Sequence, residues 1–303
     1  MSLVSMNIAI SGASGLIGSE LANRLREDGH RVVALVRSEH EATDDQHCWW
    51  DPDRGIQQLN KLEGLDAVIH LAGRSIADHR WTDAEKELLR SSRVDATEQL
   101  CKDLLKLNNP PSTFLAASAV GYYGDCGSEQ VTEQHAPGSD FLARLGVDWE
   151  AASASVQSIG TRVMHARFGV VLSPKGGALA KILPLFRWGL GSSLGNGQQY
   201  WSWISLEDTV GALRWLLMND QCEGAFNFVA PDSVTNATFT RELARAVHRP
   251  RFLPVPAFAL RLVIGEMADA ALLSSCRAQP KRLLECGYKF AHPTLTEALE
   301  ALL

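Results

Sequence analysis

The stretch 6–37, MNIAISGASGLIGSELANRLREDGHRVVALVR, constrains the fold of this chain more than any other. An apolar run at 8–10 leads into a glycine loop with Gly12, Gly15 and Gly18. An amphipathic segment follows, and a second apolar run at 32–36 ends at Arg37. The order predicts strand, tight turn, helix and strand, which is the first βαβ unit of a dinucleotide-binding fold.

The three glycines have separate tasks in such a unit. One permits the tight turn, one lets the backbone approach a diphosphate, and one lets the helix pack on the strand. The free N–H groups at the start of the helix then face the phosphates. The alternative is an ordinary strand-to-helix turn without a ligand.

Arg37 bears on which dinucleotide is bound. An acidic residue at the end of the second strand accepts hydrogen bonds from the adenosine ribose, whereas a guanidinium there suits the 2′-phosphate of NADP. We therefore expect NADP(H) rather than NAD. The alternative is a solvated arginine at the end of a strand.

Composition excludes several other classes of protein. The 303 residues carry a net charge of −6, which argues against a broad nucleic-acid-binding surface. No stretch approaches the ~20 apolar residues of a membrane helix, and the first strand begins too early for a signal peptide. The six cysteines form no CxxC pair and the nine histidines no HxH or HExxH pattern. We expect a cytoplasmic protein without a metal site and without nucleic-acid or membrane partners.

Strands and helices alternate along most of the chain, which predicts a doubly wound α/β sheet of the Rossmann type. A third strand is expected within HCWWDPDRG, and DAVIHLAG at 66–73 is typical of a parallel strand buried on both faces. Further strands are expected at 112–118, 162–172 and 225–229. Helices are expected at 82–107, 140–157, 207–217, 236–248 and 257–273, with short helices in 279–303.

The pattern changes at 173–205, where glycines and aromatic residues gather around a helix expected at 178–188. This composition favours a loop-rich cap over a pocket, and the alternative is a long surface connection. We expect an NADP-binding Rossmann domain at 6–172, to which 206–230 returns. A smaller α/β substrate-side domain is expected from 173–205 and 231–303.

Several long motifs point to a known family. GASGLIG, DAVIHLAG, AASAVGYYG, RFGVVL and WSWISLED occur in the order found in extended short-chain dehydrogenases/reductases. HLAGRSIADHRWTDAEKELLRSSRVDAT, KGGALAKILPLFRWGLG and RPRFLPVPAFALRLVIGEMADAAL resemble an atypical subgroup, the "epimerase family" proteins that are often labelled nucleoside-diphosphate-sugar epimerase-like. The resemblance runs essentially from end to end and implies a Rossmann domain with a small C-terminal domain of unknown role.

The resemblance also implies a set of coenzyme contacts. Trp50 and Asp51 would flank the adenine, unless they are a packed aromatic and a turn aspartate. Ala117 and Ser118 would lie beside the nicotinamide ribose, and Ser91 near the coenzyme side of its helix. The other implied contacts are Gly12, Ser14, Gly15, Leu16, Ile17 and Gly18 at the diphosphate, Arg37 at the adenosine end, Leu71, Ala72 and Gly73 at the adenine and ribose, and Arg167 and Phe168 at the nicotinamide.

The family's usual catalytic pair is missing from the helix expected to carry it. Ordinary members use a serine with a Tyr-x-x-x-Lys pair, in which the lysine lowers the pKa of the tyrosine. The stretch 140–157 holds neither residue type, and the aligned positions are near Leu142 and Gly146. Tyr122 or Tyr123 would then donate the proton while Ser118 orients the substrate; the alternative is that both tyrosines are packed loop aromatics.

Substrate contacts are expected from Gln199, Tyr200, Trp203 and Asp208, whereas the family's usual histidine is replaced by Ser205. Three functions stay open. The first is an NADP-dependent oxidoreductase of unknown small-molecule substrate, the second a non-catalytic NADP(H)-binding sensor or partner protein, and the third a nucleotide-sugar epimerase or dehydratase. A monomer and a homodimer paired through the helices of 82–107 and 140–157 both remain open.

Overall fold

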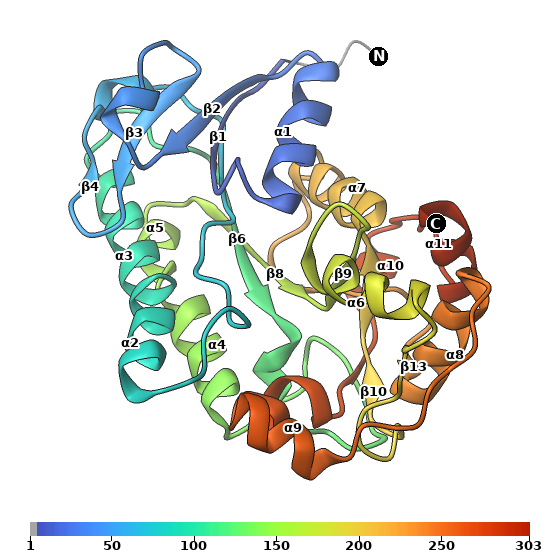
Figure 1. Cartoon of the computed structure of the whole chain (residues 1–303). Helices are drawn as coiled ribbons and strands as arrows, with labels where there is room; N and C mark the ends of the chain where they lie inside the picture. The colour runs from blue at the N-terminus through green and yellow to red at the C-terminus, as the bar shows by residue number, and fades with distance from the viewer. Residues whose placement is uncertain (1–4) are drawn as a thin grey trace.

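The computed structural model describes residues 5–303, and an eight-stranded sheet forms its centre (Figure 1). The strand order is β12-β8-β6-β5-β1-β2-β3-β4, and every neighbouring pair is parallel except β3 with β4. The strands are β1 (Asn7–Ser11), β2 (Arg31–Val36), β3 (His47–Asp51), β4 (Gly55–Ile56), β5 (Ala67–His70), β6 (Thr113–Ala119), β8 (Arg162–Phe168) and β12 (Gly224–Phe228). The expected doubly wound sheet is confirmed, and the strand order reverses between β1 and β5.

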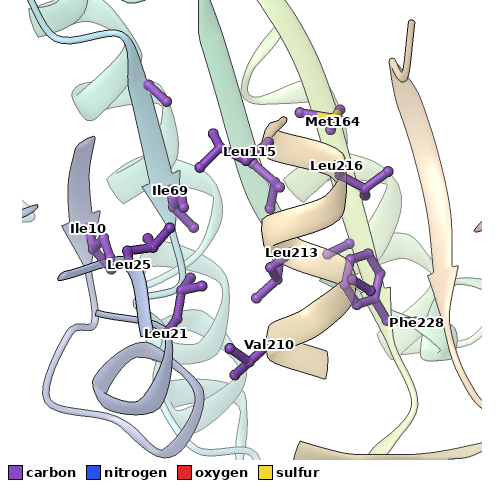
Figure 2. Close-up of a cluster of buried hydrophobic side chains, with 14 of the residues drawn as sticks. Ile10, Leu21, Leu25, Ile69, Leu115, Met164, Val210, Leu213, Leu216 and Phe228 are labelled. Atoms are coloured by element: carbon purple, nitrogen blue, oxygen red, sulfur yellow. The ribbon is translucent and has the colours of Figure 1, made fainter. Parts of the chain in front are cut away.

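Alternating residues of the strands fill two separate cores. Ile10, Leu115 and Phe228 point to the face covered by α1 (Leu16–Glu27) and α7 (Leu206–Leu217), as Figure 2 shows. Ala9 and Phe114 point to the opposite face, under α3 (Val94–Leu104) and α5 (Ala154–Gln157). Because both faces are covered, these strands are continuous apolar runs. Each large side chain fully buried in this way contributes about 1.5–3 kcal/mol.

Three helices that the sequence predicts as continuous are each broken into two. The stretch 257–273 breaks at Gly265, which adopts φ +67°, and the other two break without a Pro or Gly. The stretch 82–107 forms α2 (Asp83–Ser91) and α3, with Arg93 between them at φ −114°. The stretch 140–157 forms α4 (Phe141–Ala151) and α5, with Ser153 between them. The Ser153 hydroxyl bonds the Glu150 carbonyl and His165, so a side chain competes with the helical backbone pattern. Neither of these two breaks contains a Pro or Gly, so the sequence carries no signal for them.

The segments 173–205 and 231–303 share a third core on the right-hand side of Figure 1. Leu179, Trp203, Phe239 and Leu299 are among its buried residues. Its elements are β9 (Val170–Leu172), α6 (Gly177–Arg187), β10 (Tyr200–Trp201), β11 (Trp203–Ser205), β13 (Val234–Thr235), α8 (Asn236–Ala246) and α11 (Leu295–Leu302). The cap expected from the sequence thus contains a helix and two short strands.

The last part of the chain runs back across the molecule rather than standing apart. It contains α9 (Ala257–Ile264), the π-helical turn η4 (Ala268–Leu273), β14 (Arg277–Ala278) and α10 (Lys281–Glu285). β14 pairs with β7 (Gln130–Val131), and Leu283 of α10 is buried in the core shared with α1 and α7. No helix in residues 5–303 is long and apolar enough to cross a bilayer.

Candidate functional site

The glycine loop between β1 and α1 is held by close backbone contacts. Gly12 adopts φ +72°, and a β carbon there would lie 2.9 Å from the backbone nitrogen of Ala72. A β carbon on Gly18 would lie 2.2 Å from the carbonyl oxygen of Gly12. Only glycine is compatible with either contact. Gly12 lets the loop after β5 cross beside it, and Gly18 lets α1 pack against the turn.

Gly15 has a different environment. It stands before α1 at φ −76°, and no side chain caps the helix there. A β carbon on Gly15 would meet only the Gly12 carbonyl oxygen, at 3.3 Å, so the outer side of the turn is open. The N–H groups of Leu16, Ile17 and Gly18 are in the first turn of α1, where the helix itself gives no acceptor. An uncapped helix end beside an open glycine fits the diphosphate of a dinucleotide.

A cleft of about 430 Å³ lies directly at this helix end. One wall comes from the glycine loop and α1, and includes Ser14, Leu16 and Glu20. The opposite wall is the segment before α6, which brings Lys175 within 3.9 Å of Glu20. The sequence analysis did not predict that Lys175, Gly176 and Gly177 line this cleft. The signal that could have indicated it is the triplet Lys-Gly-Gly in front of a predicted helix, since a basic residue and glycines at a helix start suit a phosphate.

The loop after β5 is tied to the glycine loop through a buried hydroxyl. Ser11 Oγ accepts the N–H groups of Leu71 and Ala72 and lies 2.6 Å from His70 Nδ1. With those two N–H groups donating, the hydroxyl proton of Ser11 is directed to the His70 ring. Burial lowers the pKa of His70 to about 4, so the ring stays neutral. Leu71, Ala72 and Gly73 therefore lie at the expected edge of the sheet, beside Gly12.

Arg37 and Trp50 have contrasting positions at the adenosine end. Arg37 follows β2 directly and is exposed, and its side chain forms no ion pair with any residue from 5 to 303. Trp50 is only 2% exposed and packs in the core under α3, at 5.6 Å from the His70 ring. Asp51 accepts the N–H groups of Asp53 and Arg54 in a turn. The covered ring of Trp50 and the turn formed by Asp51 fit the alternative of a packed aromatic and a turn aspartate.

Ser118 and Arg167 belong to a closed, buried ionic network rather than an open site. Arg167 donates two hydrogen bonds to Glu150, at 2.7 and 2.8 Å, and the Ser118 hydroxyl donates a third at 2.7 Å. Burial alone would raise the pKa of Glu150, but hydrogen bonds from Arg167 and its charge outweigh burial and hold it below its ordinary value. Glu150 thus stays ionised, and the expected contacts of Ser118 and Arg167 with a ligand are replaced by contacts with Glu150.

The two tyrosines after β6 are in η3 (Val120–Tyr123) and differ in availability. Tyr123 is buried, donates to Asn227 Oδ1 at 2.7 Å and accepts from Arg167 at 2.9 Å. Burial raises the pKa of Tyr123 to about 12. Tyr123 is therefore unsuited to donate a proton to a substrate. Tyr122 is partly exposed and stacks on the Arg167 guanidinium at 3.6 Å, so of the two it remains the candidate donor.

Leu142 and Gly146, the positions aligned with the usual Tyr and Lys, face η3. Gly121 packs against Leu142, with a β carbon on Gly121 placed 3.4 Å from Leu142 Cβ. A β carbon on Gly146 would lie 3.3 Å from Tyr122 Cα. The backbone of η3 thus occupies the space beside α4 into which a long side chain at position 146 would extend.

Most of the residues expected at the substrate are internal in this structure. Trp203 and Asp208 are fully buried: Trp203 Nε1 donates to the Asp232 carbonyl, and Asp208 accepts from Ser205, Tyr288 and two backbone N–H groups. Gln199 donates to the carbonyls of Leu194 and Leu272. These three residues hold the third core and the C-terminal segment together. Tyr200 is partly exposed, with the Arg277 guanidinium 4.8 Å from its ring.

Three further candidates are not among the residues that line the glycine cleft. Ser91 turns back to its own helix and donates to the Leu88 carbonyl. Phe168 packs edge-on against Phe228, and Ala117 is buried against α3 and α4. Within residues 5–303 no group of His, Cys, Asp and Glu is arranged to hold a metal ion.

The sheet order, the turn at Gly12 and the uncapped end of α1 define a Rossmann-type NAD(P)-binding protein. A family model described as "NAD dependent epimerase/dehydratase family" matches residues 8–228, and "Domain of unknown function (DUF1731)" matches 255–302. The chain belongs to the NAD dependent epimerase/dehydratase family. The family resemblance given by the sequence motifs is thereby confirmed.

Relatives and solved structures match nearly the whole of this chain. Epimerase family protein Mb2239 of Mycobacterium bovis is 45% identical over 292 residues, which is 96% of each chain. The human epimerase family protein SDR39U1, solved with NADPH, superposes with a TM-score of 0.88 at 31% identity, covering 98% of this chain and 99% of that one. A nucleoside-diphosphate sugar epimerase from Corynebacterium glutamicum gives a TM-score of 0.80 at 32% identity over 99% of this chain and 59% of that one.

Proposed function

We propose that this protein binds NADP(H) at the glycine cleft and uses it to reduce a small organic acceptor without the usual Tyr-x-x-x-Lys pair. The observation that carries the proposal is the open end of α1 together with Arg37. The helix end offers unpaired N–H groups to a diphosphate, and Arg37 stands exposed at the carboxyl end of the adjacent strand β2. The human relative SDR39U1 was solved with NADPH, which is consistent with this assignment.

Arg37 is the basis for preferring NADP(H) to NAD(H). A guanidinium binds a phosphate monoester through two parallel hydrogen bonds, whereas it offers ribose hydroxyls little selectivity. Arg37 has no carboxylate partner within residues 5–303, so no acidic side chain of that part of the chain competes with a 2′-phosphate for its guanidinium.

The residues of this chain hold and shape the ligand. The amides of the first turn of α1 bind the diphosphate, and Lys175 lies across the cleft from them. Ser11 and His70 fix the Leu71–Ala72 backbone against Gly12. The nicotinamide, when bound, supplies a hydride. Tyr122 is the partly exposed phenol near the network of Ser118 and Arg167 and holds the proton that an acceptor requires.

This arrangement favours acceptors that need little help from an acid. Ser118 is engaged with Glu150, Tyr123 is internal, and Leu142 and Gly146 carry no acid or base. An activated double bond or a quinone-like ring accepts hydride more readily than an unactivated carbonyl does. We therefore infer that such acceptors are the better substrates.

Coenzyme binding is tested by titrating NADPH and NADH while following the NADPH fluorescence. Arg37→Asp should weaken NADPH binding by roughly ten- to a hundredfold, the worth of a charge-assisted contact, and leave NADH nearly unchanged. Arg31→Asp is the control, because Arg31 is exposed at the opposite end of the same strand. Equal effects of Arg37→Asp on both coenzymes would discard the NADP preference.

A non-catalytic NADP(H)-binding role is the second candidate, and a specific observation favours it. The network of Ser118, Glu150, Arg167 and Tyr123 satisfies its own polar groups and leaves no free acid or base there. A panel of enones, quinones, carbonyls and nucleotide sugars decides between the candidates. NADPH oxidation with any member supports the reductase, whereas binding without oxidation supports the sensor.

The third candidate is nucleotide-sugar epimerase or dehydratase chemistry, and the similar protein from Corynebacterium glutamicum is called a nucleoside-diphosphate sugar epimerase. Such chemistry needs a base that removes a sugar hydroxyl proton. Conversion of a nucleotide sugar to its epimer, followed by chromatography, would establish it here.

A further inference from the structure

Arg93 lies between α2 and α3, the two helices labelled on the left of Figure 1. Its guanidinium stands beside Gly73, which follows the carboxyl end of β5. Its guanidinium donates to the Arg74 carbonyl at 2.8 Å and to the Leu89 carbonyl at 3.2 Å. The guanidinium carbon is 5.1 Å from the centre of the buried Trp149 ring. These contacts hold the charged head of Arg93 in one place without neutralising it.

No carboxylate pairs with Arg93 anywhere in residues 5–303. Two acidic residues of its own helices pair with other arginines: Glu85 binds Arg74 at 2.6 Å, and Asp95 binds Arg90 at 2.7 Å. Burial lowers the pKa of Arg93 to about 10, as expected for a cation removed from water without a counter-ion. An uncompensated buried charge is costly, so its retention favours a partner that arrives from outside.

The neighbours of Arg93 show where such a partner would bind. A β carbon on Gly73 would lie 3.7 Å from the guanidinium carbon, so the absence of a side chain at Gly73 leaves that side of Arg93 uncovered. Gly73 follows β5 directly after the Leu71–Ala72 backbone that is fixed to the glycine loop. Ala117, near the end of β6, and Trp149 share one buried cluster there. Ligands of open α/β sheets bind at this carboxyl edge.

We propose that Arg93 binds an oxyanion at the carboxyl edge of β5 and β6, either a phosphate of the nicotinamide half of the coenzyme or a carboxylate of the substrate. The inference rests on the proposed function in that it takes the adjacent ligand to be a dinucleotide or its co-substrate. If the oxyanion belongs to the substrate, the substrate class narrows to acidic acceptors such as unsaturated carboxylates. Arg93 then stabilises negative charge on the substrate in place of the missing dyad.

Arg93→Gln and Arg93→Lys test the proposal, with Arg90→Gln as the matched control. Arg90 is exposed in the last turn of α2, just before Arg93, and pairs with Asp95, so its loss removes a charge without touching the edge of the sheet. Each variant is titrated with NADPH and with 2′,5′-ADP, which lacks the nicotinamide half. Sodium malonate, against sodium chloride of equal ionic strength, is then used as a carboxylate probe in thermal melts, with and without NADP⁺.

If the oxyanion is a coenzyme phosphate, Arg93→Gln weakens NADPH binding about tenfold or more and leaves 2′,5′-ADP unchanged. If it is a substrate carboxylate, NADPH binding is unchanged, but the rise in Tm that malonate causes in the wild type is lost. Arg93→Lys retains the charge without the planar guanidinium, so its ligand binding should be intermediate between that of the wild type and that of Arg93→Gln. Ligand-free Arg93→Gln should melt at or above the wild-type temperature, because an uncompensated charge has been removed.

A structural arginine would behave differently. Arg93→Gln would then lower the Tm of the ligand-free protein while NADPH and malonate acted as on the wild type, and that result would overturn the proposal. If the wild type bound neither NADPH nor 2′,5′-ADP, the proposed function would fail, and the malonate melts without NADP⁺ would still decide the role of Arg93.

Discussion

Two of the three glycines of the first turn, Gly18 and Gly15, should separate into a stabilising and a ligand-binding role when each is replaced by alanine. Gly18→Ala places a methyl group 2.2 Å from the Gly12 carbonyl oxygen, well inside the roughly 3.5 Å optimum for such contacts. The carbonyl cannot retreat, because Gly12 itself contacts the Ala72 backbone. Overpacking of this kind costs about 3 kcal/mol, which is on the order of a 10 °C fall in Tm.

Gly15→Ala should do the reverse. The backbone at φ −76° suits any residue and the nearest contact is 3.3 Å, so the Tm should stay within roughly 2 °C of the wild type. The added methyl group would nevertheless stand where a diphosphate approaches the first turn of α1. We expect NADPH affinity to fall at least about tenfold, the worth of one such charged hydrogen bond.

Gly29→Ala is the control for both variants. Gly29 also has a positive φ, +87°, but no atom lies within 4 Å of its missing β carbon. The cost is the backbone term alone, about 1 kcal/mol, and NADPH binding should be unaffected. Thermal melts by circular dichroism and NADPH fluorescence titrations give both quantities. Wild-type stability in Gly18→Ala, or wild-type NADPH affinity in Gly15→Ala, would refute the division of roles.

Three further results are expected. The pKa of His70 is about 4 in the fold and about 6.5 unfolded, so the unfolded state takes up a proton first as the pH falls. The free energy of unfolding should therefore drop by about 3 kcal/mol between about pH 6.5 and 4 in urea titrations, and the drop should be smaller in His70→Asn. Tyr123→Phe should lose about 1–3 kcal/mol of stability by unpairing Asn227, whereas Tyr122→Phe, a change at the candidate donor, should leave stability unchanged and lower any NADPH oxidation found. Asp208→Asn should likewise lower stability by about 1–3 kcal/mol while NADPH binding persists, since Asp208 is buried, accepts backbone N–H groups of the C-terminal segment and does not line the cleft; weakened binding without destabilisation would contradict this role.

The sequence predicted the glycine turn and the sheet because their signals are local. The turn is defined by residues within one βαβ unit, and apolar runs such as DAVIHLAG reveal strands that are covered on both faces. Right-handed crossovers between parallel strands then limit the strand orders that such a sheet can adopt. Our assignment of Arg37 to the end of β2 needed nothing beyond this pattern.

The polar residues of the predicted site were harder to place because burial is decided by distant partners. Ser118 and Arg167 meet Glu150, which is 32 and 17 residues away in the chain, and no spacing rule links them. A buried tryptophan such as Trp50 and an exposed ligand-binding one are alike in sequence. Lys175 was passed over for a related reason, since a lone cation in a loop segment usually faces solvent.

The way the chain's last residues reach back to α7 has a consequence for synthesis on the ribosome. Leu283 fills a place in the core between α1 and α7, and Asp208 of α7 takes its N–H partners from Ala291 and His292. When the dinucleotide-binding part of the chain emerges from the exit tunnel, its core therefore still lacks Leu283, and the Asp208 carboxylate still lacks two of its N–H donors. Nascent chains released before about residue 292 should be recognised by chaperones or proteases even though every strand of the central sheet is already present.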